Sequence, residues 1–275
     1  MMTAIFALFV LGCGEQLHRG RTAGGIAYEV QGAGPAVVLI TGSNLDRRMW
    51  AAEADWLKAR FTVVRYDLRA HGDSDSAKQP FSHVDDLFDV LDHLRIDTAA
   101  LVGLSAGSTI ALDAAVRAPH RLTRIVLAAP AIGGYSPKDR PAFFEPLVAA
   151  LQAGDYSRAE EVMLASPLLA VPDSSRALVR AMVTENNRLW TIPRELMRAP
   201  AQRAVDHLGE IKMPVLVIVG DQDLAAQREQ AEILAQRVSG ARLVLVRGGG
   251  HLVNLTSATE FKRAVLPFLL VIGLP

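Results

Sequence analysis

The sequence contains a single cysteine, Cys13, among its 275 residues. One thiol cannot form an intramolecular disulfide, and it excludes zinc or iron–sulfur sites built from several cysteines. The chain also has no excess charge of either sign, because 29 Lys and Arg residues balance 29 Asp and Glu residues. It therefore lacks the clustered positive potential that binding to nucleic acid or to an anionic membrane would require.

Long hydrophobic runs are missing as well. The apolar runs at 4–12 and 264–275 are shorter than the ~20 residues that a transmembrane helix needs. The first run has the length of a signal-peptide core. Its end, Val10–Cys13, resembles a bacterial lipoprotein cleavage box, which implies a lipid anchor on Cys13 and a location in the bacterial cell envelope. Residues 1–18 are interpreted as this segment; the alternatives are an N-terminal strand of a cytoplasmic protein or a misassigned start codon.

Hydrophobic residues make up 50% of the chain and charged residues 21%, so a sizeable core can form. From residue 24 onward, short apolar segments alternate with segments of helical periodicity. The predicted strands are Ile26–Val30, Ala36–Thr41, Phe61–Tyr66, Ala99–Leu104, Leu122–Ala129, Val215–Val219 and Leu243–Val246. The predicted helices are Trp50–Arg60, Val84–Leu94, Ala106–Arg117, Ala226–Val238 and Glu260–Leu270.

Most of these strands are continuous apolar runs, and most are followed by a helix. This order predicts an α/β fold whose mostly parallel sheet is covered by helices on both faces. The first two strands are expected to pair through the Gly- and Pro-rich turn at 32–35. Residues 19–130 and 211–275 are assigned to this core.

The segment at 131–210 interrupts the alternation of strands and helices. It is rich in proline, and helical spacing recurs at Ala142–Gln152, Arg158–Leu164 and Ser175–Trp190. We interpret it as a helical cap inserted over the carboxyl edge of the sheet, where open α/β sheets bind their ligands. A linker between two domains is the weaker alternative, because a strand follows at Val215.

The motif Gly103-Leu104-Ser105-Ala106-Gly107 lies between a predicted strand and a predicted helix. A serine at such a tight turn is exposed at a helix N-terminus, where backbone amides favour developing negative charge. Ser105 is therefore the candidate nucleophile. The alternative, a serine that only caps a Gly-rich helix, leaves the residues described next unexplained.

A nucleophilic serine needs a base, and the base needs an orienting acid. His251 follows three glycines after a late strand, and Asp223 follows the strand before it. The order Ser105, Asp223, His251 is that of the α/β-hydrolase arrangement. Asp221 also follows that strand, but it is closer to the strand end and is expected to stabilise the turn.

These motifs make the chain similar to capped esterases and lactonases of the α/β-hydrolase family over residues 22–272. The match also includes 39–43 with Trp50, and 66–74. The resemblance implies that the backbone N–H groups of Ser43 and Ala106 form an oxyanion hole, and that no metal or organic cofactor is needed. Thr41 stands where the family usually has His, and Ala70 where it commonly has Gly.

Other polar and aromatic side chains near these motifs are candidates for roles around the site. Arg69, His71 and Asp73 are interpreted as structural ties. The candidate substrate-binding residues are Asn44, Trp50, Tyr135, Phe143, Phe144 and Trp190. A turn role for Ser43 and Asn44, and a place in the core of the cap for the aromatic residues, are the alternatives.

The sequence thus predicts a serine hydrolase that acts on an ester, lactone or thioester of a small apolar acid. Hydrolysis of C–C bonds and cofactor-free perhydrolysis are alternatives that use the same three residues. A ligand-binding receptor of the same fold is an alternative from another class. Oligomeric state and natural substrate do not follow from the sequence.

Overall fold

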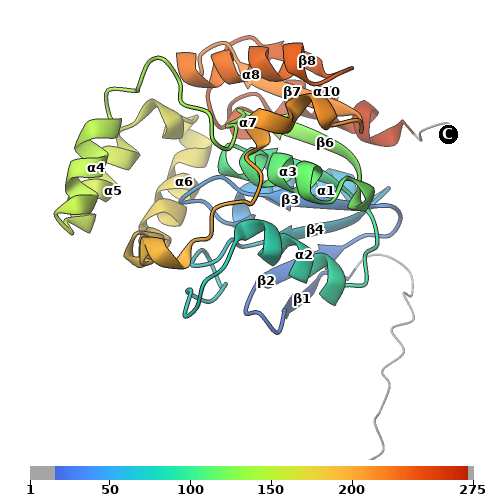
Figure 1. Ribbon diagram of the computed structural model, residues 1–275, viewed down its shortest axis with the longest axis horizontal. Helices are drawn as coiled ribbons and strands as arrows, with labels where there is room; N and C mark the ends of the chain where they lie inside the picture. Colours follow the sequence, from blue (N-terminus) through green and yellow to red (C-terminus); the bar gives the residue numbers. More distant parts are fainter. Residues whose placement is uncertain (1–15, 272–275) are drawn as a thin grey trace, which may run out of the picture.

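The computed structural model describes residues 16–271 as an eight-stranded sheet between layers of helices (Figure 1). The order of the strands in the sheet is β1-β2-β4-β3-β5-β6-β7-β8. Their bounds are β1 (His18–Arg21), β2 (Ala27–Gln31), β3 (Ala36–Ile40), β4 (Thr62–Tyr66), β5 (Ala99–Leu104), β6 (Leu122–Ala128), β7 (Val215–Gly220) and β8 (Arg242–Val246). Strands β1 and β2 are antiparallel, and the pairs from β4 to β8 are parallel, which confirms the predicted sheet.

The expected pairing of β2 with β3 is wrong. Strand β2 pairs instead with β1 and, antiparallel, with β4, whereas β3 lies between β4 and β5. The apolar β3 is buried along almost its whole length, so it takes a central position with parallel neighbours on both sides. Strand β1, the polar segment HRGR, has no apolar pattern and was not predicted.

Helices cover both faces of the sheet, as predicted. Their bounds are α1 (Ala51–Leu57), α2 (His83–His93), α3 (Ala106–Arg117), α8 (Ala225–Arg237), α9 (Val253–Thr256) and α10 (Ala258–Leu270). Helices α2, α3 and α8 pack on one face of the sheet, and α1 and α10 on the other. Side chains alternate between the two cores: Val38 and Ile40 of β3 point to the first, Val37 and Leu39 to the second.

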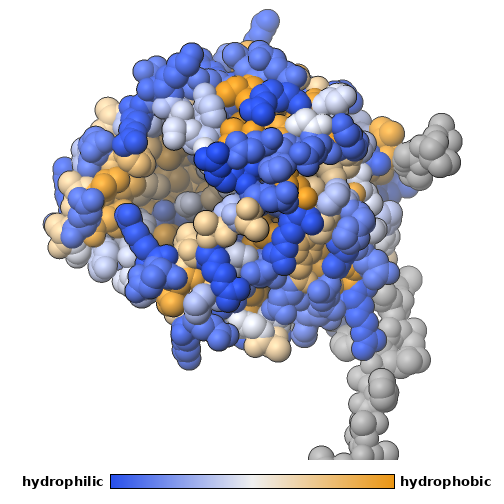
Figure 2. Space-filling view, viewed as in Figure 1, coloured by the Kyte–Doolittle hydropathy of each residue, from blue (hydrophilic) through white to orange (hydrophobic). Residues whose placement is uncertain are grey.

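The cap helices form a separate group at the left of Figure 1, over the carboxyl ends of the strands. They are α4 (Phe144–Gln152), α5 (Tyr156–Leu164) and α6 (Asp173–Glu185). Helix α7 (Ala204–His207), near the end of the predicted cap, packs instead on α3 of the core. Between the cap and the core the surface is hollowed, and much of the hollow is hydrophobic (Figure 2).

The proposed lipid anchor at Cys13 lies outside the described residues. Within residues 16–271, the longest apolar helices are still too short or too polar to cross a membrane.

Candidate active site

Ser105 occupies a sharp turn between β5 and α3. Its φ of 54° and ψ of −112° lie in a region that residues other than glycine rarely adopt. The turn is held by a hydrogen bond of 2.9 Å from its N–H to the carbonyl of Ala128. A Cβ on Gly103 would lie 2.2 Å from the carbonyl oxygen of Gly107, and one on Gly107 would lie 2.3 Å from that of Ile40. Both glycines are therefore required by close backbone contacts, and the sequence GLSAG forms this turn for that reason.

His251 and Asp223 are paired in the interior of the protein. The Nδ1 of His251 lies 3.0 Å and 3.1 Å from the two carboxylate oxygens of Asp223. Only 5% of the His251 side chain and none of the Asp223 side chain is exposed. Because a carboxylate only accepts, Nδ1 carries the proton and donates it, which leaves Nε2 as the basic nitrogen.

Asp221 takes a different position from Asp223. Its carboxylate accepts a 2.8 Å hydrogen bond from the N–H of Gly248, in the loop that leads to His251. Gly220 makes this loop contact possible, because a Cβ there would lie 2.0 Å from the carbonyl oxygen of Gly249. The structure thus places Asp223 against His251 and uses Asp221 to hold the loop that carries it.

Ser43 and Ala106 line one pocket from two sides. Ser43 belongs to the loop after β3, and Ala106 is the first residue of α3, whose N–H the helix leaves unpaired. Among residues 16–271, the N–H groups of both residues have no hydrogen-bond partner. Two free backbone donors beside a serine at a helix N-terminus are suited to bind an oxyanion.

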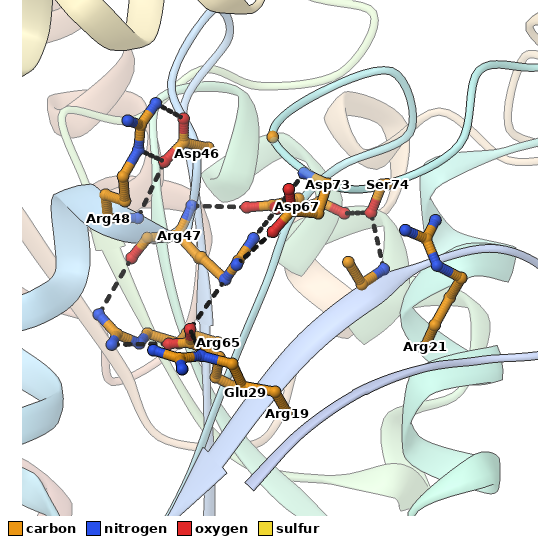
Figure 3. A network of polar contacts seen from close by, with 12 residues as sticks. Arg19, Arg21, Glu29, Asp46, Arg47, Arg48, Arg65, Asp67, Asp73 and Ser74 are labelled. Carbon is orange, nitrogen blue, oxygen red and sulfur yellow. Dashed lines mark hydrogen bonds and ion pairs between the residues drawn. The ribbon is translucent and has the colours of Figure 1, made fainter. Parts of the chain in front are cut away.

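A network of charged residues fixes the loop after β3 (Figure 3). The N–H of Arg47 donates to Asp67 at 2.8 Å, and the guanidinium of Arg47 contacts Asp67, Asp73 and Glu29. Glu29 also pairs with Arg65 at 2.7 Å. Burial alone would raise the pKa of Glu29, but the hydrogen bond from Arg19 and the neighbouring guanidinium charges lower it below its usual value. We call this group, which also includes Arg19, the Arg47 network.

The cap is attached to the same loop through Asn186, at the end of α6. Its side chain is completely buried and accepts a 2.6 Å hydrogen bond from the N–H of Gly72. The Nδ2 atom donates to the carbonyl of Asn44 at 3.3 Å and to the carboxylate of Asp46 at 3.1 Å. One cap residue therefore joins the loop that carries Ser43 to the loop after β4.

The pocket beside Ser43 and Ala106 has a volume of about 550 Å³. One face of α3, the start of α2 and the segment 197–202 form most of its wall. Its apolar lining includes Leu68, Val84, Ile110, Val116, Leu189 and Met197. The wall therefore comes from core helices and from the segment after the cap, rather than from the aromatic residues of the cap.

The expected substrate-binding role of Trp50 is wrong, because Trp50 is fully buried and packs against Phe261 in the core. Phe143 and Trp190 pack on the same core, as their alternative interpretation expected. Phe144 is exposed beside Arg140, and the hydroxyl of Tyr135 donates to Glu229 at 2.8 Å. Asn44 is buried, and its carbonyl accepts from Asn186.

Three titratable residues on the pocket wall were not among the predicted site residues: His71, His83 and Asp113. Burial lowers the pKa of both histidines to about 4 and raises the pKa of Asp113 to about 6. His71 was expected to be a structural tie, and its Nδ1 does face the carbonyl of Arg69 at 2.9 Å. The described residues contain no cluster of three His, Cys, Asp or Glu side chains suited to a metal ion.

Comparison with known proteins identifies the family. Residues 35–258 match the family model described as alpha/beta hydrolase fold. The chain is 30% identical to "Putative carbamate hydrolase RutD" of Caulobacter vibrioides, over 90% of this chain and 96% of that protein.

Two solved structures share the fold. A hydrolase from Pseudomonas aeruginosa PA01 has a TM-score of 0.75 and 29% identity, over 92% of this chain and 98% of that chain. The enol-lactonase from Burkholderia xenovorans LB400 has a TM-score of 0.76 and 27% identity, over 92% and 99% of the two chains. This chain therefore belongs to the alpha/beta hydrolase fold family and is a hydrolase.

Proposed function

We propose that the protein hydrolyses an ester or lactone of a small organic acid through an acyl-enzyme on Ser105. The observation that carries the proposal is the turn at Ser105, which lies beside two unpaired backbone N–H groups and a largely apolar pocket. The buried pair of His251 and Asp223 supports it, since it supplies an oriented base. The similarity to an enol-lactonase also supports it.

In this mechanism the Oγ of Ser105 attacks the substrate carbonyl while Nε2 of His251 takes its proton. Asp223 holds the imidazole in the tautomer that leaves Nε2 free, and it stabilises the imidazolium that forms. The N–H groups of Ser43 and Ala106 donate to the oxyanion. His251 then returns the proton to the leaving oxygen, and water releases the acid by the same steps.

A carbamate is a second candidate substrate, favoured by the 30% identity to the carbamate hydrolase-like protein. Attack on a carbamate carbonyl needs the same nucleophile, base and oxyanion donors. Thioester, C–C bond and peroxide chemistry on the same three residues remain alternatives that the substrate panel below separates.

The test is turnover of nitrophenyl esters, simple lactones and aryl carbamates by the full chain. Ser105→Ala should fold normally and lose about 10³-fold or more in kcat, since water and the oxyanion hole alone remain. A phosphonate inhibitor should add one covalent group to the wild type and none to the variant. Activity of Ser105→Ala within tenfold of the wild type would overturn the proposal. Phosphonate labelling without turnover of any ester would favour a receptor.

A further inference from the structure

The pocket has a polar patch on its otherwise apolar wall, formed by His71, His83 and Asp113. The Nε2 of His71, the Nδ1 of His83 and the Oδ1 of Asp113 are buried and have no hydrogen-bond partner among residues 16–271. Buried polar atoms without partners are destabilising, by about 1–3 kcal/mol each, and few occur in native proteins. Three of them around one pocket indicate that a ligand supplies the missing partners.

The chemistry of the patch can be derived from its known hydrogen bonds. The Nδ1 of His71 faces the carbonyl of Arg69, which can only accept, so Nδ1 carries the proton. With its pKa lowered to about 4 by burial, His71 is neutral at physiological pH, and Nε2 is therefore an acceptor. The carboxylate of Asp113, whose pKa burial raises to about 6, is ionised at the same pH and also accepts. A ligand that satisfies both must donate.

The cations close to the patch are already committed. Arg117, which lines the pocket, pairs with Asp85 at 2.5 Å, and Arg69 donates to Asp86 at 3.0 Å. An anionic ligand would therefore meet the Asp113 carboxylate without a free counter-charge. The patch favours a neutral donor, a hydroxyl or an amide N–H, over a carboxylate.

The position of the patch sets the distance of this donor from the reacting carbonyl. Ala106 and Asp113 lie seven residues apart on α3, about 10 Å along the helix axis at 1.5 Å per residue. Apolar residues such as Ile110 and Val84 line the wall between the two ends. The pocket thus presents oxyanion donors, an apolar stretch and then acceptors.

We infer that the pocket selects substrates whose acyl chain carries a neutral hydrogen-bond donor, a hydroxyl or an amide N–H, about 10 Å from the scissile carbonyl. Asp113 and His71 accept from this donor, and His83 supplies one further donor or acceptor. The inference rests on the proposed function, because it places the scissile carbonyl between Ser43 and Ala106.

The experiment compares kcat/KM for nitrophenyl octanoate, its ω-hydroxy derivative and the mononitrophenyl ester of octanedioic acid. In the extended ω-hydroxy ester the hydroxyl lies about 10 Å from the carbonyl carbon. The wild type should prefer the hydroxy ester to octanoate about tenfold, the worth of one buried hydrogen bond. It should discriminate against the dicarboxylic ester. Nitrophenyl ω-hydroxybutanoate, whose hydroxyl falls short of the patch, should gain nothing over butanoate.

Asp113→Leu should reduce the ratio of hydroxy ester to octanoate to one or below, because the hydroxyl then loses its solvation without a partner. Asp113→Asn keeps an acceptor oxygen but not the charge, so it should retain much of the hydroxyl preference and accept the dicarboxylic ester better. Asp97→Asn, an exposed position on another surface, is the matched control and should keep the wild-type ratios.

The outcomes distinguish the two proposals. Turnover of octanoate and ω-hydroxyoctanoate at equal efficiency by the wild type would overturn the selectivity and leave the proposed function standing. A tenfold preference that survives in Asp113→Leu would overturn the assignment to this patch. The absence of turnover with every ester would overturn the proposed function and this inference with it.

Discussion

The Arg47 network and the pocket wall are both built on the loops that follow β3 and β4, yet they treat polar groups in opposite ways. In the network each carboxylate faces a guanidinium, and Glu29 alone contacts Arg19, Arg47 and Arg65. On the pocket wall, buried polar atoms of His71 and Asp113 are left without partners.

The difference separates two uses of buried polarity. Charges that are mutually paired hold loops in place, and removing one member leaves an uncompensated charge, so the loss appears as stability. Groups with an open hydrogen-bonding position act on a substrate, so their loss appears as activity. The following predictions test how sharply the two uses are divided, from the largest effect to the smallest.

The carboxylates Asp221 and Asp223 should fall on opposite sides of this division although they are two residues apart. Asp223→Asn should lower kcat by about 10⁴, because the imidazole of His251 then adopts the wrong tautomer, with little change in melting temperature. Asp221→Asn should mainly lower the free energy of unfolding, by about 1 kcal/mol for its hydrogen bond to Gly248. Measurement of kcat and melting temperature for both variants decides. If Asp221→Asn is the inactive one, the assignment of the acid is wrong.

Arg47→Met should destabilise the protein by about 3 kcal/mol, because it leaves the fully buried carboxylate of Asp67 unpaired. Arg21→Met is the control, since the ion pair of Arg21 with Asp75 is exposed and should contribute at most about 0.5 kcal/mol. Urea unfolding of both variants gives the comparison. Equal stability of the two variants would show that the Arg47 network does not hold the loops together.

His71 links the pocket wall to stability through pH. Its folded pKa of about 4 lies below the unfolded value of 6.5, so the unfolded chain binds more protons between these values. Stability is therefore complete above pH 6.5 and falls by about 3 kcal/mol as the pH drops through 4. Glu53 and Asp113, whose pKa values burial raises to about 7 and 6, act in the opposite direction.

The measurement is therefore the difference in unfolding free energy between wild type and His71→Gln, followed from neutral to mildly acidic pH. The variant should lose less stability on acidification. His120→Gln, at an exposed position, should follow the wild-type curve. Parallel curves for the wild type and His71→Gln would mean that His71 is not buried in its neutral form.

Asn186 lies between the two uses, because all its polar atoms are paired but its partners include the loop of Ser43. Asn186→Ala should lower kcat about tenfold with a smaller change in KM, since the oxyanion donor at Ser43 is then held less firmly. Its neighbour Asn187, which is only half-buried, provides the control as Asn187→Ala. Equal losses in both variants, or a change confined to KM, would contradict a positioning role.

Local patterns in the sequence were sufficient for the core elements. The strand Ala99–Leu104 and the helix Ala106–Arg117 begin and end where predicted, because an apolar run and a 3.6-residue period are local signals. The pairing of β2 with β4 was not predictable in this way, since partners in a sheet are far apart in sequence.

The site divided along the same line. Asp223 and His251 could be placed together, because both follow strands at the carboxyl edge of the sheet. The pocket wall could not, since an aromatic residue such as Trp50 has the same sequence signature in a core as in a binding site. Asp113 on the buried side of α3 was a visible signal, but only the structure shows that its carboxylate lacks a partner.

The attachment of α6 also determines how the hollow between cap and core can widen. Asn186 and the neighbouring Arg188, which donates to the carbonyls of Ala70 and Ser74, fix one end of the cap to two core loops. Widening is then a rotation about this end, with the largest displacement at α4 and α5 (Figure 1). Substrates would be admitted from the side of Phe144, and the geometry around Ser43 would stay constant while they enter.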